Sequence, residues 1–237
     1  MNKQKVITDY ADYLPQYYGI VVPTLLRKYL DSTQSKALLD CGCGDGALLH
    51  ALKQQGYFYG KQIYGVDVSP KSIGLVKKID KKIQAFVDSA EILKSIKSNS
   101  IDFLVSTHVV EHVDDKKMLK AVERVVKKDG IVYLGTVFKK WYGWYYNRRD
   151  GKWVMDVTHL REYTSDEQLM SLINKEKFRV LEVKKSLIFF PVVDFIARRL
   201  FVKNRKLFSE NSILEFIRGL KVPVPGYYNW EVVLQKR

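Results

Sequence analysis

A short stretch in the first quarter of the chain carries the residue types most able to do chemistry. From Leu38 to Leu52 the chain reads LLDCGCGDGALLHAL, so an apolar run ends in an acid and three glycines follow at alternate positions. Glycine lets a backbone turn sharply and approach a ligand closely. A carboxylate beside such a turn can accept hydrogen bonds or face a positive charge. The stretch predicts a small-molecule site made by Asp40, Gly42, Gly44 and Gly46.

Two ligand chemistries fit this turn. The dinucleotide fingerprint G-x-G-x-x-G/A begins at Gly42, and Asp67 follows at the end of the next apolar run, where an acid holds the ribose hydroxyls of NAD. A pyrophosphate would be disfavoured next to Asp40, whereas S-adenosylmethionine has no phosphate and carries a sulfonium and an ammonium group. Asp88, in FVDSAE, suits the amino group of an adenine. The residues favour S-adenosylmethionine, and an NAD-dependent dehydrogenase stays as the alternative.

Histidine and glutamate supply a second group of reactive side chains. Glu111 lies between His108 and His112 in HVVEH, and His159 follows an aromatic stretch in VTHLREYT. Methyl transfer needs mainly alignment of the acceptor, but a hydroxyl acceptor is helped by a general base or a metal ion. We predict that at least one of the two candidate catalytic residues, His112 or His159, activates the acceptor as a metal-free base. A mixed His/Glu metal site, suited to Zn, Mn, Fe or Co rather than Mg, and a purely structural role are the alternatives.

The elements that position these residues alternate between strands and helices. Apolar runs predict strands over residues 36–41, 62–69, 83–89, 101–107 and 130–138, and amphipathic runs predict helices over 46–55, 70–80 and 115–130. Pro70 fits the first helical position, and Gly130 fits a helix end. Runs that are apolar on both faces are typical of a covered parallel sheet. The order predicts a doubly wound α/β fold.

The pattern changes after residue 138. Residues 139–153 are aromatic and basic and predict a long loop, and a helix is expected within 163–178, with Thr164 and Glu167 spaced as a capping box. Strands follow at 179–190 and 229–237. We expect a single domain that comprises a helical N-terminal segment (1–35), a core (36–189), a basic and apolar insertion with a helix over 192–202 (190–226), and the last strand (227–237).

Four stretches in order carry a family resemblance: LLDCGCGDG, IYGVDVS, FVDSAE and IDFLVSTHVVEHV. They resemble the successive motifs of class I S-adenosylmethionine-dependent methyltransferases, of the type 11/23 kind that includes the ubiquinone-biosynthesis O-methyltransferases. The resemblance implies a Rossmann-like, doubly wound, seven-stranded sheet whose antiparallel last strand inserts between strands five and six. The cofactor-binding residues that it implies are Asp40, Gly42, Gly44 and Gly46 at the methionine and ribose, Asp67 at the ribose hydroxyls, Val68 beneath the adenine, Asp88 with Ser89 at the adenine edge, and Thr107 or His108 at the methionine end.

The histidine group also resembles metal-assisted O-methyltransferases, with one departure. The ubiquinone-biosynthesis enzymes and the small-RNA 3′-end 2′-O-methyltransferases bind a divalent ion through Glu-x-x-Glu-His, and the RNA enzymes add a later histidine. His108 stands here where that pattern has its first glutamate, whereas His159 matches the context of the later histidine. The resemblance therefore leaves a divalent metal as an option that it does not favour.

Charge and cysteine usage bear on partners and location. The formal net charge of +14 over 237 residues favours anionic partners, unless the lysines serve only solubility. The only cysteines, Cys41 and Cys43, lie too close on a tight turn for an ordinary disulfide, so we expect a cytoplasmic protein. No signal peptide or membrane span is recognisable. We expect the insertion at 190–226 to pack over the sheet, to make a peripheral contact with an anionic membrane or, as the least favoured alternative, to bind nucleic acid.

We therefore expect an S-adenosylmethionine-dependent enzyme that methylates a hydroxyl of a small-molecule, lipid-linked or glycan acceptor and releases S-adenosylhomocysteine. An RNA 2′-O-methyltransferase is the alternative enzyme, with nucleic acid the less favoured partner, and a non-catalytic binding module is the alternative of another class. Adenine amino-methylation is disfavoured because THVV stands where an Asn/Asp-Pro-Pro-aromatic stretch is needed. Cytosine C5 methylation is disfavoured because no cysteine follows Cys43.

Overall fold

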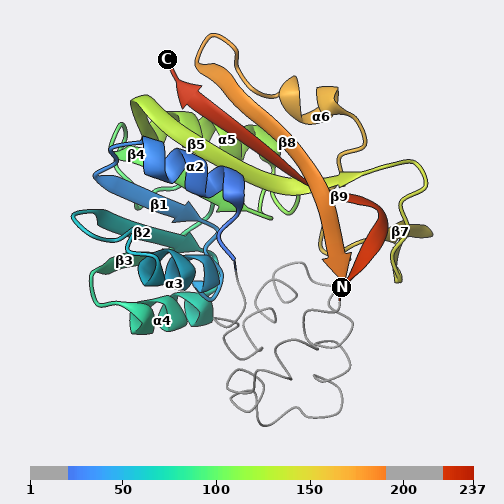
Figure 1. Cartoon of the computed structure of the whole chain (residues 1–237), viewed down its shortest axis with the longest axis horizontal. Coiled ribbons are helices and arrows are strands. Elements are labelled where there is room, and N and C mark those ends of the chain that lie inside the picture. The colour runs from blue at the N-terminus through green and yellow to red at the C-terminus, as the bar shows by residue number, and fades with distance from the viewer. Residues whose placement is uncertain (1–20, 191–220) are drawn as a thin grey trace.

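The computed structural model describes residues 21–190 and 221–237 (Figure 1). Seven of its strands form one sheet in the order β3-β2-β1-β4-β5-β9-β8. The strands are β1 (Ala37–Cys41), β2 (Gln62–Asp67), β3 (Ile83–Val87), β4 (Ile101–Thr107), β5 (Val126–Lys139), β8 (Phe178–Phe190) and β9 (Val222–Lys236), with a separate hairpin of β6 (Asn147–Arg149) and β7 (Lys152–Val154). β9 lies between β5 and β8 and is antiparallel to both, whereas the first five strands pair in parallel. The predicted doubly wound sheet with an antiparallel last strand is confirmed.

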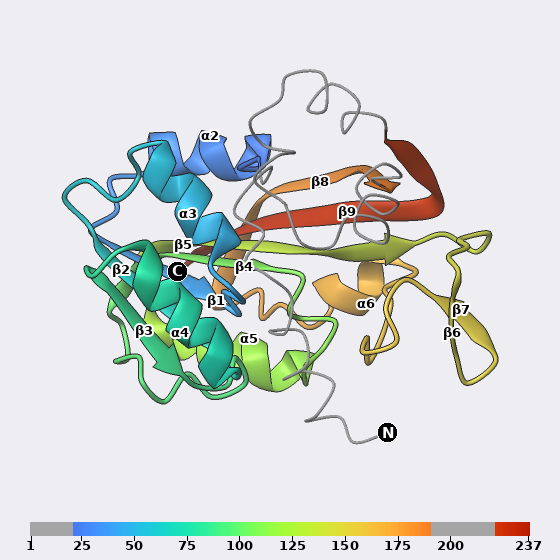
Figure 2. The same ribbon diagram turned by 90° about the horizontal axis from the view of Figure 1, so that it is seen from below.

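Helices cover both faces of the sheet. Leu38 packs with α2 (Thr24–Ser32), α3 (Ala47–Gln54) and α4 (Pro70–Ile79), whereas its neighbour Leu39 packs with α5 (Asp115–Val125) and α6 (Asp166–Met170). Successive residues of a strand point to opposite faces, so an uninterrupted apolar run such as β1 feeds both cores. Figure 2 shows α2 and α5 on opposite sides of the strands. Pro70 begins α4 as predicted.

Two predicted helix features are wrong. The helix expected over 115–130 ends at Val125, and β5 begins at Val126, which pairs with Ile101. Gly130 is therefore not a helix cap. It lies within β5, where an added Cβ would be 2.9 Å from the Lys127 carbonyl oxygen and 3.2 Å from that of Asp102.

The predicted capping box of the helix near residue 166 is also absent. Ser165 is the residue before α6, and its side chain makes no capping hydrogen bond. The Gln168 side chain instead accepts a hydrogen bond from the Thr164 N–H at 2.7 Å. Glu167 therefore lies in the first turn of α6, where a negative charge stabilises a helix, but it does not form the predicted capping box with Thr164.

The aromatic stretch at 139–153 is more ordered than the predicted loop. It contains the β6–β7 hairpin, which turns at Asp150 and Gly151 with φ of 49° and 77°. Two successive positive φ values belong to the tight turn that an Asp-Gly pair favours between strands. The hairpin projects beyond the carboxyl end of β5 (Figure 2).

The last strand is longer than predicted. β9 begins at Val222, which pairs with Phe190 of β8, so residues 222–226 lie in the sheet and not in the expected insertion. The helix expected over 192–202 and the segment 1–20 lie outside the described residues. Within the described ranges, none of the helices is long and apolar enough to cross a membrane.

Candidate active site

The glycine turn connects β1 to α3 at the carboxyl edge of the sheet. Gly42, Gly44 and Gly46 have φ of 78°, 52° and 83°, a region that L-residues enter at a cost of about 1–2 kcal/mol each. A Cβ at Gly42 would lie 2.2 Å from Val109 Cγ2, and one at Gly46 would lie 2.4 Å from Ile79 Cδ1. A Cβ at Gly44 would meet no atom within 4 Å. The fold needs the outer two glycines, and the middle one faces open space where a ligand can approach.

Asp67 holds this turn from the end of β2. Its Oδ2 accepts a hydrogen bond from the Gly44 N–H at 2.9 Å, and its Oδ1 accepts one from the Ser69 N–H at 2.8 Å. Burial raises the pKa of Asp67, although these two hydrogen bonds oppose the rise. The adjacent Val68 is 43% exposed, and its place beneath the adenine stays a prediction. A carboxylate has lone pairs beyond these two bonds, so contact with ribose hydroxyls remains a prediction that the position of Asp67 supports.

Asp40 is the most unusual acid of the turn. It is 2% exposed, and its Oδ2 has no hydrogen-bond partner. Burial, and secondarily the charge of Asp67, raise the pKa of Asp40 to about 7. A buried carboxylate oxygen without a partner is costly, and a cationic ligand group would relieve that cost.

Asp88 and Ser89, predicted at the adenine edge, shape the turn after β3. Asp88 Oδ1 accepts from the Ser89 N–H, and its Oδ2 accepts from both the N–H and the hydroxyl of Ser95, each at 2.7 Å. Ser89 Oγ accepts from the Glu91 N–H at 3.2 Å. The Asp88 N–H donates to the Asp67 carbonyl at 3.0 Å, so the two acids are on adjoining backbone. Whether Asp88 also accepts from an adenine stays a prediction.

The turn after β4 packs directly on the glycine turn. Asp40 pairs with Val105 in the sheet, and Val109 is the residue that a side chain at Gly42 would strike. Thr107 ends β4 half-buried, and His108 follows with φ of 55° and an N–H that donates to Gly135. The two predicted groups of residues are therefore parts of one site.

Glu111 lies fully buried at the centre of this turn. Its Oε1 is 3.2 Å from His108 Nδ1, and its Oε2 accepts from the Thr136 hydroxyl at 2.9 Å. Desolvation opposes both charges, although the His108 side chain is half-exposed, and their mutual hydrogen bond and attraction outweigh it, so the pKa of Glu111 is lowered and that of His108 is raised. His108 therefore hydrogen-bonds to Glu111. It does not provide the carboxylate that the first glutamate of the metal-binding pattern would provide.

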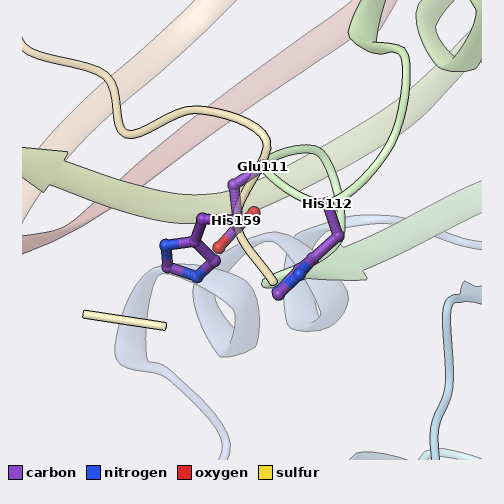
Figure 3. A group of neighbouring side chains, drawn as sticks. All are labelled: Glu111, His112 and His159. Atoms are coloured by element: carbon purple, nitrogen blue, oxygen red, sulfur yellow. The ribbon is translucent and has the colours of Figure 1, made fainter. Parts of the chain in front are cut away.

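His112 and His159 meet beside Glu111 (Figure 3). Their ring centroids are 4.7 Å apart, and one ligand atom from each of the three side chains lies within 4.8 Å of the others. The Leu160 N–H donates to the Glu111 carbonyl at 2.7 Å, which fastens the later segment to the turn after β4. Burial lowers the pKa of His112, and the charge of His159 adds to this while Glu111 opposes it. A neutral imidazole can accept a proton or bind a metal ion.

Sequence reasoning missed the residues that hold His159. Its Nδ1 is 3.2 Å from Glu162 Oε1, which also accepts from the Met155 N–H at 2.6 Å. Glu162 Oε2 is 3.1 Å from Lys139 Nζ and accepts from the Tyr227 hydroxyl at 3.0 Å. Burial opposes the charge of Glu162, but these partners lower its pKa. The spacing of three residues between His159 and Glu162 is the local sequence feature that could have suggested their contact.

Comparisons with known proteins agree with this geometry. Residues 39–134 match a family model described as a methyltransferase domain. A ubiquinone biosynthesis O-methyltransferase of Bartonella quintana is 26% identical over 159 residues, which are 61% of this chain and 61% of that protein. A probable S-adenosylmethionine-dependent methyltransferase of Saccharomyces cerevisiae is 26% identical over 55% of this chain and 45% of its own. The matches thus span less than two thirds of these relatives.

Solved structures agree on the fold. The crystal structure of an S-adenosylmethionine-dependent methyltransferase from Methanosarcina mazei superimposes with a TM-score of 0.62, at 16% identity, over 92% of this chain and 99% of that one. The chain has the fold of the class I S-adenosylmethionine-dependent methyltransferases and is similar to methyltransferase domains in sequence over residues 39–134. The dehydrogenase alternative is thereby set aside.

The residues of the turn fit the cofactor of this methyltransferase family. The unpartnered Oδ2 of Asp40 suits a cationic sulfonium or ammonium group, and the open space at Gly44 suits close approach of a ligand to the backbone. Glu111, His112 and His159 also form a donor set that could hold a divalent ion, since each imidazole keeps one nitrogen clear of its Nδ1 partner. Both oxygens of Glu111 are already engaged, by His108 and Thr136, which is an argument against a tight metal site.

Gly44 offers a test of the cofactor turn. Because a methyl group there meets no protein atom within 4 Å, Gly44→Ala is expected to cost only left-handed strain, about 1–2 kcal/mol of unfolding free energy. The methyl group enters the ligand space, so we expect the affinity for S-adenosylhomocysteine to fall more than about tenfold in titration calorimetry. Gly46→Ala is the matched comparison, since contact with Ile79 should lower the melting temperature further. Unchanged affinity in Gly44→Ala would mean that the ligand does not approach this residue.

Proposed function

We propose that this methyltransferase transfers the methyl group of S-adenosylmethionine to a hydroxyl group of a small-molecule, lipid-linked or glycan acceptor. The observation that carries the proposal is the convergence of His112 and His159 next to the glycine turn. An amine acceptor that is already nucleophilic needs no base, whereas a hydroxyl benefits from one. The half-buried His112 ring and the buried His159 ring, next to the glycine turn, therefore support an oxygen acceptor.

The residues of the chain divide the work of such a reaction. When bound, S-adenosylmethionine would supply an electrophilic methyl group for transfer to the acceptor oxygen. Asp40 would face the cationic end of the cofactor, and Asp67 would accept from the ribose hydroxyls. His112 would take the proton that the acceptor hydroxyl loses, because its lowered pKa keeps it neutral at pH 7. His159 would sit beside it as a second base or as an orienting neighbour.

The hairpin region supports an amphipathic or carbohydrate acceptor. Exposed aromatic side chains cluster there on and before β6–β7: Trp141, Tyr142, Trp144, Tyr146 and Trp153. The Arg148 guanidinium lies 4.5 Å from the centroid of the Trp153 ring. Aromatic rings of this kind pack on sugars and on lipid chains near a polar surface. The match to ubiquinone biosynthesis enzymes adds support for an acceptor with a hydroxyl on an apolar body.

A peripheral contact with an anionic membrane forms part of this proposal. Trp and Tyr favour the interface between lipid and water, and Lys and Arg are attracted to acidic headgroups. Co-sedimentation with vesicles should increase with the fraction of anionic lipid and decrease with salt. Absence of binding even to strongly anionic vesicles would remove the membrane from the proposal and leave a soluble acceptor.

An RNA 2′-hydroxyl is the second candidate acceptor. The net charge of +14 and the same exposed aromatic rings favour it, since single-stranded bases stack on aromatic side chains. Binding to RNA that weakens steeply with salt, together with methylation of RNA, would support this alternative. Salt-dependent binding without methylation would not.

The test of the proposed function begins with the cofactor. The chain is titrated calorimetrically with S-adenosylhomocysteine and, in parallel, with NAD⁺, each with and without EDTA, and hydroxylated acceptors are then screened by mass spectrometry. We expect micromolar binding of S-adenosylhomocysteine alone and a mass increase of one methyl group on a hydroxyl compound. Binding without turnover on any acceptor would favour a non-catalytic module. A rate that falls in EDTA and recovers with Zn²⁺ or Mn²⁺ would assign Glu111, His112 and His159 to a metal ion.

A further inference from the structure

A chain of hydrogen bonds reaches His112 from the segment that carries His159. The Nδ1 atom of His112 is 2.9 Å from the Thr158 hydroxyl oxygen, and that oxygen is 2.6 Å from Asp156 Oδ1. The Thr158 N–H also donates to Asp156 Oδ1, at 2.7 Å. The contact between Thr158 and His112 was not expected from the sequence, because the two residues are 46 positions apart.

The direction of each hydrogen bond follows from the number of protons. A hydroxyl group has one proton to donate and lone pairs to accept with. Asp156 Oδ1 already accepts the Thr158 N–H, so it serves as the acceptor for the Thr158 hydroxyl as well. The hydroxyl then has only lone pairs to offer His112, and the proton between them must belong to His112 Nδ1. A neutral imidazole has a single N–H, so its Nε2 is left with a free lone pair.

The same logic applies to the second imidazole. His159 Nδ1 is held by Glu162, whose two oxygens also accept from Met155 and Tyr227. The segment 156–162 therefore supplies an acceptor for the Nδ1 proton of each ring. Free histidine favours the opposite tautomer, with its proton on Nε2, so the tautomer of His112 depends on its partner.

We propose that Thr158, oriented by Asp156, is a positioning residue that holds His112 in the Nδ1–H tautomer and keeps its Nε2 lone pair available to the acceptor. The inference about the tautomer rests on the hydrogen bonds alone. Its consequence for catalysis rests on the proposed function, in which His112 takes the proton of the acceptor.

The first experiment reads the tautomer directly. Two-bond ¹H–¹⁵N correlation spectra of the full chain distinguish the two neutral tautomers of each histidine, and the chain has only four histidines. His112→Gln assigns the signal of His112. We expect the Nδ1–H pattern in the wild type and in Thr158→Ser, which keeps the hydroxyl, and an Nε2–H or mixed pattern in Thr158→Val, which removes it. An Nε2–H pattern in the wild type, or no change in Thr158→Val, would overturn the proposal.

A second variant covers the case in which Thr158→Val does not fold. Asp156→Ala leaves the Thr158 hydroxyl free to turn and donate to His112 Nδ1, so the proton of the ring should move to Nε2. A wild-type tautomer in Asp156→Ala would contradict the assigned direction of the hydrogen bonds. Titration with S-adenosylhomocysteine reports whether each variant retains a folded cofactor site.

Kinetics separate this inference from the proposed function. We expect Thr158→Val to lower kcat about 10- to 100-fold with little change in KM for the cofactor, and Thr158→Ser to recover most of the rate. A fully active His112→Ala would refute the role of His112 while leaving the tautomer result standing. An inactive His112→Ala beside a fully active Thr158→Val would refute the positioning role alone.

Discussion

Replacing His112 with alanine should lower the rate of methyl transfer about 10²- to 10⁴-fold, the usual contribution of a positioned general base. The substitution removes the imidazole that meets His159 beside Glu111. The cofactor turn should be unaffected, because no hydrogen bond joins the His112 ring to Asp40 or to the three glycines in the part of the chain that the structure describes. We therefore expect the loss in kcat, with the affinity for S-adenosylhomocysteine changed less than about threefold.

The control for this variant is His50→Ala. His50 lies on α3 and takes no part in the cluster at Glu111, so its removal tests whether loss of any histidine near the turn affects turnover. Rates are measured by the formation of S-adenosylhomocysteine with a fixed acceptor. If His112→Ala and His159→Ala both turn over at nearly the wild-type rate, neither ring activates the acceptor. A metal-dependent reaction would differ from base catalysis in that EDTA would reduce the rate of the wild type as strongly as His112→Ala does.

The geometry of the glycine turn could be predicted from the sequence because its determinants are local. Gly42, Gly44 and Gly46 need their positive φ within six residues of Asp40, and Asp67 ends the adjacent strand, whose pairing with β1 follows from the fold class. Parallel strands bring their carboxyl ends to one edge, so residues that follow successive strands converge there. The same rule explains why the turn at His108, which follows β4, lies beside the glycines.

The partners of the histidines could not be predicted in the same way. Tyr227 reaches Glu162 from the antiparallel strand β9, and Thr136 reaches Glu111 from within β5. Both contacts depend on the register of strand pairing. A shift of one residue would turn each side chain to the other face of the sheet and remove the contact. The predicted boundary between α5 and β5 was wrong for a related reason. Pairing of Val126 with Ile101 in the sheet overrides the helix-like sequence pattern of 126–130.

Asp88 marks the limit of the family resemblance. The motif position suggests a free carboxylate at the adenine edge, but in this chain both Asp88 oxygens already accept hydrogen bonds from Ser89 and Ser95. The bonds order the turn that begins at the end of β3 and leave some lone pairs unused. Residue type and order therefore predict where the acid lies. They do not predict how many of its hydrogen-bond acceptor positions are already occupied by Ser89 and Ser95.

Asp40→Asn should weaken the binding of S-adenosylmethionine and S-adenosylhomocysteine about 10- to 100-fold, the range for loss of a hydrogen bond to a charged group. The buried Oδ2 of Asp40 has no protein partner, and an amide there offers no charge to the ammonium group of the ligand. Affinity of the wild type should also rise with pH up to about 7, because Asp40 must be ionised to face a cation and its pKa is about 7. The affinity of Asp40→Asn should lack this slope.

The same substitution should stabilise the ligand-free protein at alkaline pH. Burial raises the pKa of Asp40 from its usual 3.8 to about 7, so the folded state binds this proton more tightly than the unfolded state does. Stability linked to the group is complete below about pH 4 and is lost as pH rises through 7, by an amount on the order of 4 kcal/mol. Asparagine cannot ionise, so denaturation at pH 5 and pH 8 should show a smaller loss in Asp40→Asn than in the wild type.

Asp45→Asn is the matched control, because Asp45 lies on the same turn but is half-exposed, and its hydrogen bond from the Ala47 N–H can be kept by an amide. It should follow the wild type in both measurements. If Asp40→Asn raises the stability of the ligand-free protein and lowers its affinity for the ligand, the buried charge of Asp40 serves ligand binding and destabilises the fold. Equal pH slopes in the wild type and in Asp40→Asn would instead mean that Asp40 stays ionised or stays protonated throughout, and that another group faces the cation.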